Sequence, residues 1–332
     1  MRLAALITAA ALAAALTVAG CSPAATPTPP PDASSVLTAA SKATYPTKLE
    51  FTLGGSYTAS GATTTLPDKL LTIDIDTAAG TGSVHFAVPA SLLGASGGAA
   101  LAQLGITGDS ITFDALYDGK AVYAKSPAMP ALVTQLAALA QGVTLPQLGP
   151  DTWAKVLDEA TIQQIAGAAK GAVESAAPSA SASTTELKTV VEQMGGSITL
   201  GAQTTGAGGP AYDVKLTVDP AKLQAYMTAH PEQFPASQAQ TLSALGQLTS
   251  ISADVLIDVA TSRVEQVTLA IAGTESGSPV SASLKVGIAE APASVSFAAP
   301  ANAVDLPLVK ILGPLLQSMM GAGGLPIPTA AP

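Results

Sequence analysis

The chain has 332 residues, of which 48% are hydrophobic, 11% are charged and 4% are aromatic, and its formal net charge is −9. This acidic balance argues against nucleic acid as a partner, because phosphate binding requires clustered lysine and arginine. The low charge does not indicate disorder, because the hydrophobic content is high enough for a packed core. The single cysteine excludes a disulfide framework, a Cys-x-x-Cys redox pair and a cysteine-based zinc cluster.

Residues 1–20 have the organisation of a secretory signal. Arg2 supplies a positive charge, and an apolar run of 16 residues extends from Leu3 to Val18. A membrane-spanning helix needs roughly 20 residues, so this run is short for that alternative. The run closes on Val18-Ala19-Gly20-Cys21, which is typical of a lipobox, the signal for cleavage before a cysteine and acylation of that cysteine. An ordinary signal peptide is the remaining alternative, because small residues also suit ordinary signal peptidase.

Lipidation at Cys21 predicts a protein anchored on the extracytoplasmic face of the cell membrane. Burial of acyl chains contributes about 0.8 kcal/mol per CH₂ group, so two or three chains hold the protein stably. Loss of Arg2 with the signal leaves 13 basic against 23 acidic residues, a formal charge of −10. Residues 21–33 are rich in proline and threonine and predict an extended, semi-rigid tether.

The domain beyond the tether begins with a short predicted helix, through about Ala43, for which Ser34 and Ser35 offer an N-cap. Apolar and polar residues then alternate over 47–53, 71–76 and 84–88, the signature of antiparallel strands with one packed face. Two further strands, 111–117 and 120–125, flank Asp118-Gly119, a strong hairpin signal.

The middle of the chain shows helical spacing. We expect helices over 130–141, from Pro150 through Trp153, Val156 and Leu157 to about residue 177, and over 186–194. Residues 178–185 are a Ser/Ala-rich loop. Strands return over 212–218, 255–259, 267–271, 282–288 and 295–297, with helices after Asp219-Pro220 and over 238–248. The order of strands, helices and strands predicts an α+β domain with a largely antiparallel sheet.

The tail is apolar over 306–320 and too short to span a membrane. Two interpretations are open for this segment. It is an amphipathic helix docked on the domain, or a helix that touches the membrane or covers a pocket.

Motifs for catalysis are weak. Neither His85, on a polar strand face, nor His230, in a Pro-flanked turn, has a partner at metal-ligand spacing, which argues against zinc. Gly94-Ala95-Ser96-Gly97-Gly98 fits G-x-S-x-G, and Asp219 and His230 follow in the order of a hydrolase triad, but no buried parallel strand leads into the turn. The carboxylate pairs Asp74/Asp76 and Asp254/Asp258 predict solvated strand faces. The sequence therefore predicts no enzyme, metal or cofactor, with a serine hydrolase as the remote alternative.

The pattern resembles the LppX/LprG-type lipoproteins and, more distantly, the LolA/LolB fold. The resemblance rests on residues 253–259 and 263–269, where an Asp-led turn joins two strands, and continues through Leu284-Lys285-Val286 to Phe297-Ala298-Ala299-Pro300. Residues 117–123 resemble the family's Asp-Gly hairpin, and residues 149–153 precede helices at the expected place. The match spans roughly residues 34–305, between the tether and the apolar tail of 306–332.

The resemblance implies a curved, mostly antiparallel half-barrel with helices on its concave face, enclosing an apolar cavity for acyl chains. Members of the family carry lipids or lipoproteins across the envelope. The expected function is therefore to bind a lipid or glycolipid and carry it within the envelope, and the alternative is a scaffold lipoprotein with a protein partner and no ligand. Ten apolar positions are the expected cavity lining: Phe51, Leu71, Ile73, Phe86, Phe113, Val214, Leu216, Ile257, Leu269 and Leu284.

Overall fold

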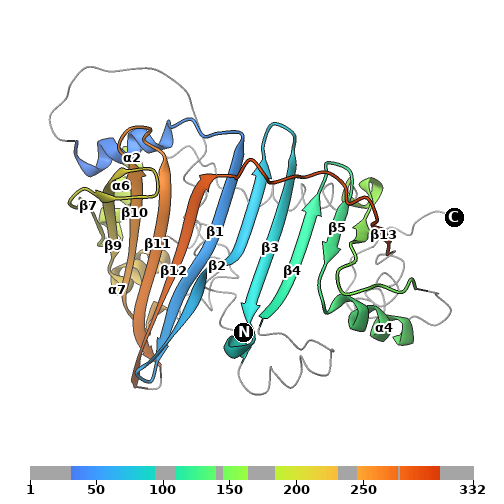
Figure 1. Cartoon of the computed structure of the whole chain (residues 1–332). Helices are drawn as coiled ribbons and strands as arrows, with labels where there is room; N and C mark the ends of the chain where they lie inside the picture. The colour runs from blue at the N-terminus through green and yellow to red at the C-terminus, as the bar shows by residue number, and fades with distance from the viewer. Residues whose placement is uncertain are drawn as a thin grey trace. The chain divides into compact units, whose positions relative to one another are not determined.

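The structure is a computed structural model that describes residues 31–93, 110–139, 145–163, 184–230, 245–275 and 277–306. The described chain is mostly β, with thirteen strands in one mixed, mainly antiparallel sheet and few short helices (Figure 1). The strands pair in the order β13-β6-β5-β4-β3-β2-β1-β12-β11-β10-β9-β7, and β8 pairs with β9. The chain divides into two compact units, one of residues 1–70 and 178–290 and one of 71–177 and 291–332.

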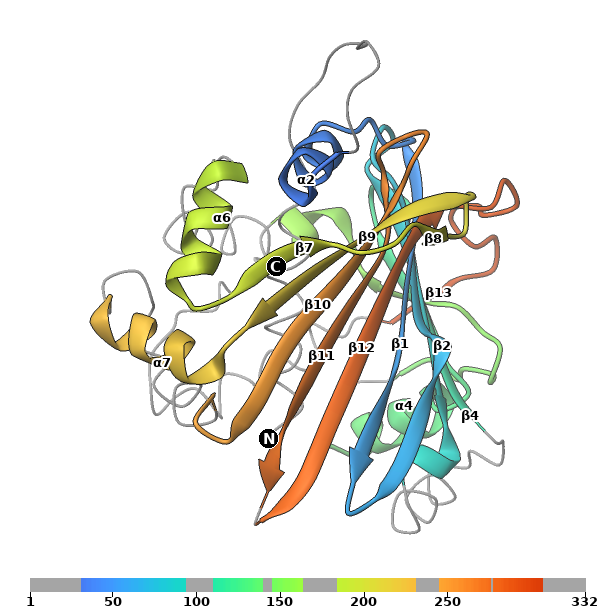
Figure 2. The ribbon, with the colours of Figure 1, turned by 90° about the vertical axis from the view of Figure 1, so that its left-hand side faces the viewer.

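Unit 1 contains the longest strands of the sheet and two short ones. These are β1 (Lys48–Ala59), the first part of β2 (Ala62–Asp76), β7 (Ser197–Leu200), β8 (Thr204–Thr205), β9 (Pro210–Val218), β10 (Leu248–Asp258), β11 (Val264–Glu275) and β12 (Ser278–Glu290). Its helices are α2 (Ala33–Ser41), α6 (Thr184–Gln193) and α7 (Pro220–Ala229), which lie on one side of these strands (Figure 2). Neighbouring strands from β1 through β12, β11 and β10 to β9 are all antiparallel.

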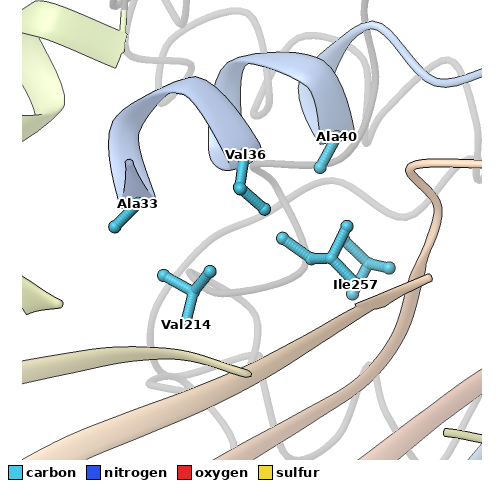
Figure 3. Packing of buried hydrophobic residues seen from close by; sticks show 6 residues of the cluster. Ala33, Val36, Ala40, Val214 and Ile257 are labelled. Carbon is cyan, nitrogen blue, oxygen red and sulfur yellow. The ribbon is translucent and has the colours of Figure 1, made fainter. Parts of the chain in front are cut away.

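Helix α2 is fixed by its N-cap and by an apolar core. The Asp32 carboxylate accepts a hydrogen bond from the Ser35 amide at 2.7 Å, so Asp32 caps the helix, two or three residues before the expected Ser34 or Ser35. Val36 and Ala40 point from α2 toward Val214 and Ile257 of the sheet (Figure 3). Val214 and Ile257 are only 0% and 1% exposed, so this is the most completely packed part of unit 1.

Unit 2 is built from shorter strands. It contains the end of β2, β3 (Thr81–Pro89), β4 (Ser110–Tyr117), β5 (Val122–Lys125), β6 (Ala154–Leu157) and β13 (Val304–Asp305), with the short 3-10 helix η2 (Ala90–Leu93) and helix α4 (Met129–Leu139). All described pairings here are antiparallel except that of β13 with β6, which is parallel. One apolar cluster joins α4 to the β5–β6 edge through Met129, Val133, Ala124, Ala154 and Leu306.

Most expected strands and the helices α2, α4, α6 and α7 are confirmed. Most ends shift by a few residues, but β2 begins at Ala62 rather than 71 and β10 at Leu248 rather than 255. The helix expected from Pro150 is wrong over residues 154–157, which pair with β5 as β6, but it is confirmed over residues 159–163, which are helical. The expected strand at 295–297 is also wrong, since the backbone there has no regular structure. The α+β class therefore shifts to mostly β. The expected helices over 164–177 and 238–244 and the tail beyond 306 lie outside the described residues.

The β4–β5 hairpin turns one residue later than expected. Tyr117 pairs with Val122, so the turn residues are Gly119-Lys120 rather than Asp118-Gly119. The Asp118 carboxylate accepts hydrogen bonds from the amides of Lys120 and Ala121, each at 2.8 Å, and Gly119 takes a φ of +95°. The pairing shifts by two residues, an even number, so Tyr117, Ala115 and Val122 lie on one face of the hairpin.

None of the helices in the described ranges has the length and apolar character that a membrane span requires.

Candidate functional site

An apolar face runs across unit 1 in rows of directly opposed residues. Leu216 of β9 pairs with Ala253 of β10, Ala253 with Leu269 of β11, and Leu269 with Leu284 of β12. A neighbouring row continues to β1 and consists of Val214, Val255, Val267, Val286 and Leu53. The register therefore brings expected cavity residues from β9, β11 and β12 onto one face. Since residues opposite each other in a sheet have Cβ atoms roughly 5 Å apart, each row is continuous.

This face has two zones that differ in burial. Beneath α2, Val214 and Ile257 belong to the packed core, together with Val264. Away from α2, the side chains are only half-buried, and these include the predicted lining residues Phe51, Leu269 and Leu284. Leu216 is also half-buried, but it packs against the core under α2. The strands β1, β9, β11 and β12 thus carry large apolar side chains that the protein does not fully remove from water.

The other four predicted lining residues belong to unit 2. Leu71 of β2 pairs with Phe86 of β3, and Phe86 with Phe113 of β4, so these three form one row. Ile73 starts the adjacent row, which continues through Val84 to Ala115. Leu71, Ile73 and Phe86 are half-buried, and Phe113 is 39% exposed. The apolar face of this unit also retains contact with water.

A pocket lies on the opposite, polar face of unit 2. Its volume is about 330 Å³, and it is lined by Ser83, Val84, His85, Asp114, Ala115, Leu116, Trp153, Ser296, Ala298 and Pro300. His85 pairs with Asp114 across β3 and β4, and the distance from His85 Nδ1 to Asp114 Oδ1 is 2.6 Å. Lys125 of β5 lies 3.3 Å from the other carboxylate oxygen of Asp114, and its ammonium is 5.2 Å from the centre of the Trp153 ring.

Sequence reasoning missed this cluster. Alternation placed His85 on the polar face, but only the register brings Asp114 and Lys125 beside it, and Trp153 was assigned to a helix. One signal could have found Asp114. It follows Phe113 in β4, and because Phe113 was expected on the apolar face, Asp114 belongs on the polar face with His85. Strand pairing itself depends on which neighbours assemble, and no local pattern gives it.

The carboxylates expected on solvated strand faces are partly buried. Asp74 is 8% exposed and accepts a hydrogen bond from Ser83 at 3.2 Å, and Asp258 is 7% exposed. Both amide and hydroxyl of Thr261 donate to Asp258 Oδ1, at 2.6 Å each, so Asp258 closes the β10–β11 turn. The Thr261 hydroxyl and amide hold the pKa of Asp258 below its ordinary value, because both favour the charged carboxylate. The expectation of solvation is therefore wrong for Asp74 and Asp258.

The residues of the hydrolase alternative do not form a triad. Asp219 is the N-cap of α7 and His230 its C-cap, so the ten-residue helix separates them by about 15 Å. His230 instead contacts the Tyr226 ring, with ring centres 4.6 Å apart. Ser96 lies outside the described residues. Within the part of the chain that the structure describes, no three His, Cys, Asp or Glu side chains are grouped to hold a metal ion.

Cys21, with the signal and tether of residues 1–30, also lies outside the described residues, so its lipidation stays a prediction. No model of a known protein family matches the chain, and no curated protein matches it either.

Proposed function

We propose that the protein is a surface-anchored lipoprotein that binds a lipid or glycolipid on the apolar face of unit 1 and carries it within the cell envelope. The observation that carries this proposal is the half-buried row Leu216-Ala253-Leu269-Leu284, beside a fully packed zone under α2. Val214 and Ile257 are packed to near-zero exposure, whereas Leu269 and Leu284 on the same face remain in contact with water. Apolar surface in contact with water has an unfavourable free energy, and a bound apolar molecule offsets it.

The ligand class follows from the shape and chemistry of this face. Parallel rows of Leu, Val and Ala offer an apolar surface without charged groups, and an acyl chain complements such a surface along its length. An acyl chain that leaves a bilayer loses about 0.8 kcal/mol per CH₂ group, and burial against this face returns much of that loss. The exchange is then close to neutral, as carriage without catalysis requires. The resemblance to LppX/LprG-type lipoproteins supports the same class of ligand, and the half-barrel with helices on its concave face is part of this proposal.

The anchor supports the same conclusion. An acylated Cys21 with a proline-rich tether holds the domain beside a bilayer, the source of the ligand, and leaves the domain free to turn. Partition of the protein into a detergent phase, lost on Cys21→Ala substitution, tests this location.

Native mass spectrometry of the Cys21→Ala chain, purified without detergent, tests the binding. We expect a co-purified lipid mass, and uptake of a fluorescent fatty acid after delipidation. Leu284→Asn should lower that uptake at least tenfold, because it places an amide on the apolar row. Ser283→Asn, one residue away on the opposite face of β12, is the matched control and should bind normally.

The proposal is contradicted if native mass spectrometry shows only the mass of the protein without a ligand and the protein takes up no fluorescent fatty acid. A defined protein partner trapped by crosslinking in cells, with no lipid bound, would instead favour the envelope scaffold.

A further inference from the structure

We infer that the pocket on the polar face of unit 2 is a second, independent binding site, which takes a neutral hydroxylated ring of monosaccharide size. The site is separate from the proposed lipid-binding face, because it is lined by unit 2 alone.

The pocket is built on a row of polar groups held in fixed positions by strand register. Thr72, His85, Asp114 and Lys125 are directly opposed on β2, β3, β4 and β5. The pairing of Ala124 with Ala154 places Lys125 opposite Trp153, so the row extends to the start of β6. Side chains in such a row have little freedom, because each is flanked by a cross-strand partner. A site on rigid strands is preorganised for a ligand.

The segment after β12 packs against the adjacent row of the same face, which runs through Ser83, Leu116 and Tyr123. Phe297 packs against the cluster of Leu116, Ala121 and Tyr123, which also contacts Trp153. Its neighbours Ser296 and Ala298, together with Pro300, line the pocket from the other side. The result is an open hollow on the polar sheet face, in which Asp114 is partly buried and the His85 side chain stays 48% exposed.

The charges within the pocket cancel. Each oxygen of the Asp114 carboxylate has a partner, His85 at 2.6 Å and Lys125 at 3.3 Å. The Asp114 carboxylate is therefore neutralised by its own neighbours and offers a ligand no uncompensated charge. This favours a neutral ligand.

Several hydrogen-bonding groups remain for such a ligand. Because His85 Nδ1 is bonded to Asp114, Nε2 is the ring nitrogen left to accept or donate. Ser83 donates to Asp74 and keeps acceptor capacity, and Ser296 and the Trp153 indole N–H add donors. The hydroxyl groups of a sugar both donate and accept, and they match this mixed set.

The remaining lining fits the other surface of a sugar. Leu116, Ala298 and Pro300 are small or apolar and can contact the C–H groups of a ring. The volume of about 330 Å³ is at the lower end of the roughly 300–1,000 Å³ typical of small-molecule pockets, which limits the ligand to about one ring.

Trp153 makes the test direct, because it is the only tryptophan in the chain. The full chain in detergent would be titrated with glucose, galactose, mannose and arabinose while Trp153 emission and its quenching by acrylamide are recorded. We expect at least one sugar to change the emission saturably and to protect Trp153 from acrylamide.

Two substitutions locate the binding. His85→Gln and Asp114→Asn should each weaken the sugar at least tenfold. His230→Gln, at the only other histidine, should leave the affinity unchanged. Circular dichroism and the unfolding midpoint would show whether each variant is folded, and saturation-transfer NMR would report sugar contact by a route independent of Trp153.

The inference is overturned if no sugar affects Trp153 and none shows saturation transfer, or if folded His85→Gln binds as tightly as the wild type. It is also overturned if acetate or phosphate, rather than a sugar, causes the saturable change. Loss of lipid binding in the Leu284→Asn variant leaves this test untouched, because the two sites are read out separately.

Discussion

Truncation of Ile257 and of Leu269 should destabilise the protein by different amounts. Ile257→Ala removes three carbon groups from a side chain that is 1% exposed in the core under α2. At about 0.8 kcal/mol per buried CH₂ the transfer loss is about 2.4 kcal/mol. The cavity left behind raises the loss to about 3–4 kcal/mol, within the range of about 2–5 found for such substitutions.

Leu269→Ala removes the same number of carbon groups from a half-buried position. About half of the transfer loss applies there, roughly 1.2 kcal/mol, and little cavity forms because the site is already open. Ile257→Val, which removes one methyl group, should cost about 0.5–1.5 kcal/mol and serves as the control for packing under α2.

The free energy of unfolding would be measured in urea by circular dichroism, on the Cys21→Ala chain freed of lipid, because a bound ligand adds its own stabilisation. Hydrogen exchange of peptides from β9 to β11 would assign the effect to unit 1. Equal losses for Ile257→Ala and Leu269→Ala would refute the reasoning, because they would mean that the whole face is a closed core with no room for an acyl chain.

Asp118→Ala should lower the stability of unit 2 by about 1–3 kcal/mol, because the carboxylate holds the β4–β5 turn, and urea unfolding followed by Trp153 emission checks this. The stability of unit 1 should fall as the pH drops below about 4. Hydrogen bonds from Thr261 depress the pKa of folded Asp258, so its contribution is present above the unfolded pKa and is lost as the pH falls through the folded one. Asp258→Asn should flatten that decline in urea midpoints, and an unchanged slope would count against it. Gly195→Ala should destabilise α6 by about 1 kcal/mol, because φ is +70° there, and an unchanged melting temperature would contradict this.

Strand existence and the division of each strand into two faces could be predicted from the sequence. Leu269 and Leu284 alternate with polar neighbours, and period-two patterning needs only local information. Helix α7 was also predictable, because Asp219-Pro220 combines an N-cap with a proline at the first helical position.

Other features depend on groups that are distant in the sequence. Residues 154–157 have apolar spacing compatible with a short helix or a strand, and pairing with β5 decides for the strand. The turn at Gly119-Lys120 moved by one residue because the Asp118 side chain binds the turn amides, which competes with the simple Asp-Gly rule. The His85–Asp114 pair required a register between β3 and β4 that no local signal gives.

The burial of unit 2 shows most clearly why patterning alone could not give the site. Alternation divides its strands into an apolar face, with Phe86 and Phe113, and a polar face, with Asp74 and Asp114. The usual inference is that the apolar face is covered and the polar face solvated. Here Asp74 is 8% exposed and Phe113 is 39% exposed, because the segment around Phe297 packs over the polar face instead.

The segment around Phe297, almost two hundred residues from β4, therefore decides which face of unit 2 is covered. Sequence periodicity does not predict where that segment packs. Covering a polar face requires that its charges be paired, and the hydrogen bonds and ion pair of Asp114 meet that requirement. A half-buried apolar face has an unfavourable free energy of contact with water, and no other part of the described fold offsets it. The covered polar face is where the sugar is proposed to bind. The half-open apolar face is a surface that a lipid could cover. A sequence that only had to fold would have no reason to keep them, which is the physical argument for binding as the function of this domain.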